Sequence, residues 1–194
     1  MYTLREFPAG LDLSNCTNAY QFAIYMRSLT YVPDLNGPTN KCVDFRYMFY
    51  GSETISTVDA TFDTSGATQV ARMWGYCRAL RKLPGTYDFS NVSTESTAAD
   101  QGVNQFIIDC SSLQEVNIIG LKRNMYFRNC SFDRDQIVNM FNNLENITGA
   151  VLYPGESVPR VTQRTLYISG NIGLQTLTQT DRDIAINKGW ILNG

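Results

Sequence analysis

Two carboxylate pairs are the residues of this sequence whose type and spacing could support acid–base chemistry. Asp133 and Asp135 form one pair, and Asp181 and Asp183 form the other. Two carboxylates that flank a bond can cleave it, as in glycosidases, so a carbohydrate-active enzyme is one hypothesis. Each pair also stands at the start of a predicted helix, where aspartate accepts hydrogen bonds from backbone N–H groups and meets the helix dipole. We favour capping over catalysis and predict that the chain is not an enzyme.

Other catalytic and metal-binding patterns are missing from the sequence. It has no histidine, which removes the commonest general base, and no GxSxG, P-loop or GxGxxG pattern. Its cysteines form no CxxC pair, so neither a structural metal nor a cofactor is predicted. We expect all of them to be buried free thiols rather than disulfides. They are Cys16, Cys42, Cys77, Cys110 and Cys130.

The composition limits the class of protein and its partners. With 194 residues, the chain suits one domain over 1–194. Charged residues make up 18% and the net charge is −2, so no basic footprint for nucleic acid exists. No apolar run approaches the roughly 18 residues of a membrane helix, so membrane insertion is not expected. The many tyrosines and phenylalanines indicate core packing first, with tyrosine also common on recognition surfaces.

Apolar residues recur along the chain at offsets of four, seven and ten from a leading residue. This spacing predicts supersecondary units that stack on one another, with Leu29, Ile55, Leu80 and Leu113 in one buried column and the following apolar residues beside them. The four copies are Phe22, Met26, Leu29 and Val32; Met48, Ser52, Ile55 and Val58; Met73, Cys77, Leu80 and Leu83; and Phe106, Cys110, Leu113 and Val116.

The predicted fold is an α+β repeat protein, a leucine-rich-repeat-like solenoid with short strands, few short helices and a cap at each end. Residues 1–14 are expected to form an N-terminal cap of strand, turn and strand, and residues 15–121 about four repeats with a surface-loop insertion at 91–101. Residues 122–194 are expected to form a divergent repeat and the C-terminal cap. This part should hold strands at 125–127, 151–159 and 165–171, a capped helix from Asp133 to Leu144, and a helix from Thr178 to Lys188 that Gly189 ends.

Several motifs resemble the BspA-like leucine-rich repeats of bacterial surface proteins. They cover residues 11–121 and 160–192 and include SNCTN at 14–18, YMFYGS at 47–52, DFSNVS at 88–93 and CSSL at 110–113. The segment from Leu166 to Trp190 is similar to the C-terminal cap of such proteins, which also occur among phage virion proteins. The insertion at 91–101 and the segment 122–158 depart from the pattern. The resemblance implies a non-enzymatic binding or structural role and carries no catalytic residues.

A binding surface is predicted on the strands of the units. In a Leu-x-x-Leu strand the two intervening residues point outward, and stacking places them side by side. The alternative is that this face is only the solvated side of the sheet. Its mixed polarity suits a glycan or a polar protein surface better than an apolar ligand. The predicted residues are Thr30, Tyr31, Ser56, Thr57, Arg81, Lys82, Gln114 and Glu115, flanked by Asp34 and Asp59.

Two biological settings remain open at this point. The first is a phage virion component such as a fibre, tail or capsid decoration protein, which binds other virion proteins or a host-surface glycan or protein. The second is a fragment of a bacterial cell-surface adhesin. Met1 stands directly before the first expected strand without a signal peptide, which favours localisation in the virion. Open strand edges and a weakly charged, aromatic-rich surface also predict an oligomer or attachment to a larger assembly.

Overall fold

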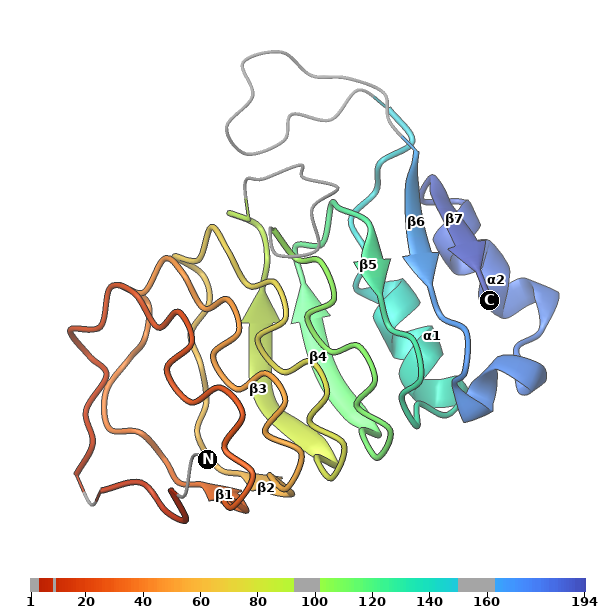
Figure 1. The fold of residues 1–194 in the computed structure, drawn as a ribbon. Coiled ribbons are helices and arrows are strands. Elements are labelled where there is room, and N and C mark those ends of the chain that lie inside the picture. Colours follow the sequence, from red (N-terminus) through yellow and green to blue (C-terminus); the bar gives the residue numbers. More distant parts are fainter. Residues whose placement is uncertain (1–3, 9, 93–101, 150–162) are drawn as a thin grey trace.

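The computed structural model describes residues 4–8, 10–92, 102–149 and 163–194, and this part of the chain is a mixed α+β structure. It is mostly coil, with short parallel strands and two short α-helices, as Figure 1 shows. The strands are β1 Tyr31–Val32, β2 Thr57–Val58, β3 Lys82–Asp88, β4 Glu115–Ile119, β5 Met125–Tyr126, β6 Arg164–Tyr167 and β7 Trp190–Asn193. The helices are α1 Arg134–Asn142, the 3-10 helix η1 Ile172–Thr176 and α2 Gln179–Ile186.

Segments one unit apart in the sequence pair with each other in parallel. The described strands form the sheets β1-β2, β3-β4 and β5-β6-β7, so the chain advances from one end of the molecule to the other (Figure 1). Val32 lies opposite Val58, and Lys82 lies opposite Glu115. Parallel pairing needs a long connection between partners, and the paired strands here lie 26 to 41 residues apart in the sequence.

A second set of backbone hydrogen bonds joins the turns that precede the strands. Alternate N–H groups of residues 19–25 donate to carbonyls of 44–50, those of 45–51 donate to 69–75, and those of 70–76 donate to 102–108, all at 2.7–3.1 Å. We call this set the turn ladder. A positive φ of 55–57° recurs at the same position of each of the four sequence copies. The residues at this position are Gln21, Tyr47, Arg72 and Gln105.

The core lies between the turn ladder and the strands. Leu29, Ile55, Leu80 and Leu113 are all fully buried, which confirms the predicted burial of this column, and Val32, Val58, Leu83 and Val116 beside them are buried too. Phe22 differs from the leading residues of the other units because it is 37% exposed. It belongs to the first unit, which no earlier unit covers, and its ring stacks on Phe7 at 5.7 Å between centroids.

The N-terminal lead-in does not form the predicted strand–turn–strand. In residues 4–8 and 10–14 the structure has only an isolated bridge between Asp12 and Asn36. The Leu13 N–H donates to the Asn36 carbonyl at 3.3 Å, so the backbone partner of this segment is the first unit and not a second strand of its own. The buried side chains of Phe7 and Leu13 attach the lead-in to the core.

The C-terminal region confirms the predicted helices and most of the predicted strands. Asp133 caps α1 by accepting from the Gln136 N–H, and Thr178 forms a capping box with Asp181 at the start of α2. Gly189 follows α2 with φ +90°, the conformation that suits glycine after a helix. β5 and β6 lie where short strands were expected. The predicted strand at 151–159 and positions 93–101 of the predicted insertion lie outside the described residues.

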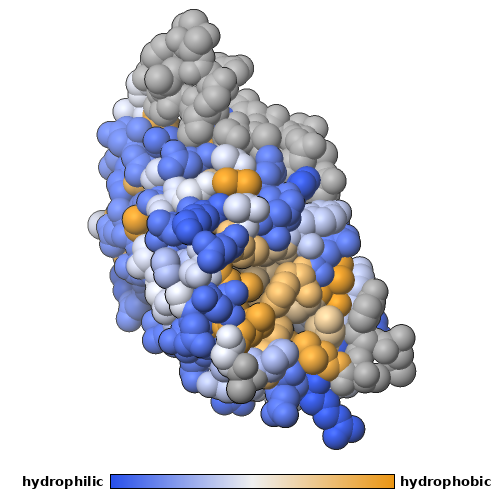
Figure 2. Space-filling model, turned by 90° about the vertical axis from the view of Figure 1, so that its left-hand side faces the viewer, coloured by the Kyte–Doolittle hydropathy of each residue, from blue (hydrophilic) through white to orange (hydrophobic). Residues whose placement is uncertain are grey.

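The N-terminal end of the described chain exposes apolar side chains (Figure 2), whereas helices pack together at the C-terminal end. Figure 2 faces the N-terminal end and shows an apolar hollow bordered by polar side chains. The N-terminal residues that pack on the core while keeping partial exposure include Leu4, Leu11 and Met26. At the C-terminal end, α1 packs against η1, α2 and β4. None of the helices in the described ranges has the length and apolar character needed to cross a membrane.

Candidate functional site

The eight residues predicted to form a binding face are all exposed in the structure. They lie on or directly before β1, β2, β3 and β4, and we call them the strand face. β1 and β2 place Tyr31 opposite Thr57, and β3 and β4 place Lys82 opposite Glu115. Contacts between β2 and β3 join the β1–β2 pair to the β3–β4 pair. The structure therefore brings the predicted residues together along one run of neighbouring strands.

Several side chains of the strand face already bond to one another or to neighbours. Lys82 Nζ lies 2.8 Å from Glu115 Oε1, but both side chains are more than half exposed, so this ion pair adds little stability. The Tyr31 hydroxyl donates to Asp59 Oδ2 at 2.6 Å, and this bond raises the pKa of Tyr31 above its ordinary value. The face is thus an ordered, mixed polar surface that could accept further hydrogen bonds from a partner.

A second surface, which sequence reasoning missed, lies on the turn ladder. Its tyrosine rings meet edge to face, with centroid distances of 5.3–6.0 Å. An arginine lies against each of four rings: Arg46 over Tyr20 at 5.1 Å, Arg72 over Tyr47 and Tyr50 at 5.5 and 5.6 Å, and Arg78 over Tyr76 at 6.0 Å. We call this surface the Tyr/Arg strip, and its members are Tyr20, Tyr25, Tyr47, Tyr50, Tyr76, Arg46, Arg72 and Arg78.

A signal for the strip was present in the sequence. Tyr20 and Arg46 occupy the same position of successive units, and so do Tyr47 and Arg72. Stacking places each arginine one layer beyond a tyrosine, where the guanidinium can cover the ring. Apolar periodicity does not reveal this pairing, because tyrosine and arginine are different residue types at one unit position.

A column of hydroxyl and thiol groups lies inside the stack. Ser52, Cys77, Cys110 and Cys130 each donate to a carbonyl of an earlier unit, those of Ala23, Phe49, Trp74 and Ile107, at 2.8–3.2 Å. Burial raises the pKa of the three thiols well above the ordinary value. The five cysteines are free, as predicted, and Cys16 alone among them is only partly buried. Thiols with raised pKa values are poor nucleophiles, so this column is structural.

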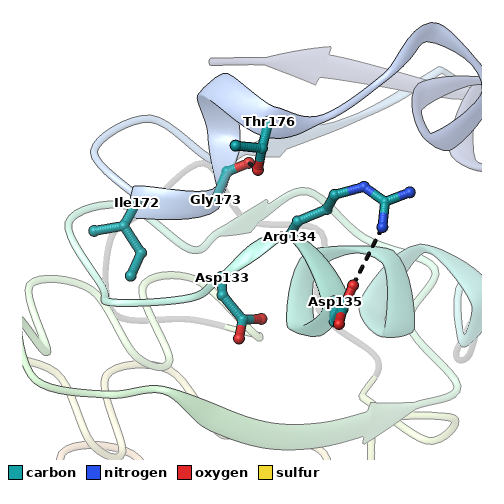
Figure 3. Close-up of a pocket in the computed structure, with 6 residues that line it drawn as sticks. All are labelled: Asp133, Arg134, Asp135, Ile172, Gly173 and Thr176. Atoms are coloured by element: carbon teal, nitrogen blue, oxygen red, sulfur yellow. Dashed lines mark hydrogen bonds and ion pairs between the residues drawn. The ribbon is translucent and has the colours of Figure 1, made fainter.

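Asp133 and Asp135, two of the four aspartates weighed for acid–base chemistry, line a small open pocket between α1 and η1 (Figure 3). The pocket has a volume of about 310 Å³. Asp133 is engaged in the helix cap, and Arg134 bonds to both Asp181 carboxylate oxygens, at 2.7 and 2.9 Å, and to Asp135 at 3.2 Å. Asp133 thus caps α1 and Asp181 belongs to the capping box of α2, as predicted, whereas Asp135 bonds to Arg134 and Asp183 accepts from Gln179 Nε2 at 2.8 Å. In the described ranges, no group of three or more potential ligand residues could hold a metal ion. The pocket is lined by Asp133, Arg134, Asp135, Ile172, Gly173 and Thr176.

Comparison with protein-family models, with curated proteins and with solved structures finds no match for this chain. The case for a function therefore depends on the residues and surfaces described above.

Proposed function

We propose that this chain is a non-enzymatic recognition module that binds a partner through its strand face. The observation that carries the proposal is the exposure of all eight outward residues on neighbouring, parallel-paired strands. A face of this kind offers hydroxyl, amide and charged groups in fixed register, which suits a glycan or a polar protein surface. Of the four carboxylates that could have served an enzyme, Asp133 and Asp181 are engaged in helix caps, and Asp135 and Asp181 bond to Arg134, which is consistent with this proposal.

The architecture that we propose is a leucine-rich-repeat-like solenoid. The parallel pairing of successive units, the buried column from Leu29 to Leu113 and the turn ladder support it. The BspA-like motifs at 14–18, 47–52, 88–93 and 110–113 support the same family type. In such a solenoid, residues 1–14 would form the N-terminal cap, 15–121 the repeats, and 122–194 the divergent repeat and C-terminal cap.

The biological setting that we propose is the virion, as a fibre, tail or capsid decoration protein. This placement depends on the resemblance to repeat proteins that occur in phage particles. The apolar hollow at the N-terminal end (Figure 2) supports association with another subunit or a larger particle, because large exposed apolar patches commonly mark interaction sites. A bacterial cell-surface adhesin would use the same strand face.

Attachment of a triple variant tests the recognition role. Replacing Tyr31, Arg81 and Lys82 by Ala is expected to weaken binding to the particle or host surface, while the melting temperature stays nearly unchanged because all three side chains are exposed. A double variant with Ala at Arg5 and Arg27 removes the same two charges elsewhere and should bind normally. Unaltered attachment of the triple variant would refute the strand face as the contact surface. Copurification of the native protein with phage particles would support the virion setting, and its absence from particles would favour the cell-surface adhesin.

A further inference from the structure

The Tyr/Arg strip has the composition of a protein interface. Tyrosine and arginine are enriched in interface cores and in the residues whose truncation costs most binding energy. On this strip two of the rings, those of Tyr25 and Tyr50, pack directly against the backbone of glycine residues. A Cβ added at Gly51 would meet Tyr25 Cδ1, and one added at Gly75 would lie 3.1 Å from Tyr50 Cδ2, so both rings rest directly on glycine backbone. Such side chains lose little further freedom when a partner binds.

The charges of the strip are unevenly compensated. Arg46 pairs with Asp44 at 2.7 Å, and Arg78 lies 3.5 Å from Glu53. Arg72 lies between them and has no carboxylate partner among the described residues. Its guanidinium donates to Gln105 Oε1 at 2.7 Å and to the Tyr47 hydroxyl at 3.2 Å, both neutral acceptors. The centre of the strip therefore carries a positive charge that is fixed in position and to which no carboxylate of the described residues is bonded.

The arrangement of the rings favours a protein over a sugar as the partner. A sugar ring needs a flat aromatic face on which to stack, whereas Tyr20, Tyr47, Tyr50 and Tyr76 each have a guanidinium over the ring. The polar groups of the strip are phenol hydroxyls and guanidinium N–H groups. A carboxylate side chain can approach a guanidinium from its edge without displacing it from the ring.

We propose that the Tyr/Arg strip is a second interaction surface, which binds an acidic segment of a partner protein with Arg72 as the central contact to a carboxylate. The strip lies on the turns of the first three units and shares no residue with the strand face. Variants of one surface therefore leave the other intact, so loss of binding through the strip and loss of binding through the strand face can be measured separately.

Arg72→Gln is the variant that tests this proposal. Gln21 and Gln105 occupy the same unit position, with φ values of 57° and 55° against 56° for Arg72, so the backbone accepts glutamine there. Arg27→Gln is the matched control, because Arg27 is exposed and lies outside both surfaces. Thermal melting of both variants verifies that they fold.

The probe is a fluorescein-labelled synthetic peptide of alternating Glu and Ser, measured by fluorescence anisotropy at low salt. We expect the wild type and the Arg27→Gln variant to bind it and the Arg72→Gln variant to bind about tenfold more weakly, since a charge-assisted hydrogen bond is lost. The same peptide with Gln in place of Glu should bind weakly to all three proteins.

Three results would overturn the proposal. The first is absence of binding to the acidic peptide up to millimolar concentration. The second is equal affinity of the Arg72→Gln and Arg27→Gln variants, which would show only bulk charge attraction. The third is binding of a hyaluronan oligosaccharide, but not the peptide, with dependence on Arg72, which would assign the strip to an acidic glycan. The triple variant of the strand face should bind the peptide normally.

Discussion

The hydroxyl of Ser52 is expected to contribute strongly to stability, although it lies in a column otherwise occupied by cysteines. Ser52 is fully buried, and its Oγ accepts from the Met26 N–H at 2.9 Å and donates to the Ala23 carbonyl at 2.8 Å. Both partners belong to the first unit. The hydroxyl therefore satisfies one donor and one acceptor of the unit that begins the stack.

The cost of Ser52→Ala follows from these two bonds. Each net hydrogen bond is worth about 1 kcal/mol, and a buried group left without a partner costs more, so we expect a loss of about 2–4 kcal/mol. Ser52→Cys should lose less, about 1–2 kcal/mol, because a thiol donates to the equivalent carbonyl at Cys77, Cys110 and Cys130. Against a total stability of about 5–15 kcal/mol, both losses are measurable.

Urea denaturation followed by circular dichroism measures these differences. Ser56→Ala is the control, because Ser56 is exposed and its hydroxyl makes only a long bond of 3.3 Å to the Thr30 carbonyl, so it should cost less than about 0.5 kcal/mol. The slope of the transition should be the same for all variants. If Ser52→Ala costs no more than Ser56→Ala, or if Ser52→Cys is no better than Ser52→Ala, the reasoning about this column is refuted.

Three further predictions concern the core, the thiols and a buried carboxylate. Leu80→Ala should cost about 2–5 kcal/mol in the same assay, since Leu80 is fully buried between Ile55 and Leu113; a loss below 1 kcal/mol would contradict the column. A thiol reagent should modify Cys16 first and the four buried cysteines only on unfolding, with five thiols titrated in non-reducing denaturant; two fewer would indicate a disulfide. Hydrogen bonds from Thr178, and then Arg134, hold the pKa of Asp181 below its ordinary value of 3.8, so its stabilisation is present above that pH and is lost as pH falls through the lower folded value. Asp181→Asn should flatten acid unfolding in this range, and an unchanged pH profile would contradict the assignment.

The sequence was sufficient to predict those features that depend on local chemistry or on spacing along the chain. Asp133 and Thr178 were identifiable as helix caps because a side chain three residues from an N–H can satisfy it without help from distant parts of the fold. The column of Leu29, Ile55, Leu80 and Leu113 was identifiable because stacked units repeat the same inward position. The exposure of the strand face followed from the alternation of side chains along a strand.

Tertiary structure alone decided which groups are neighbours across units. The lead-in failed to form its own strands because Leu13 pairs with Asn36, a partner that no local pattern indicates. Phe22 kept part of its surface exposed because no unit precedes it, a property of position in the stack and not of the residue. The Tyr/Arg strip arose because the tertiary structure set Arg46 and Arg72 over rings that are 22–26 residues away in sequence. Contacts of this kind depend on the register between neighbouring segments, which the backbone hydrogen bonds of the turn ladder fix in the folded chain.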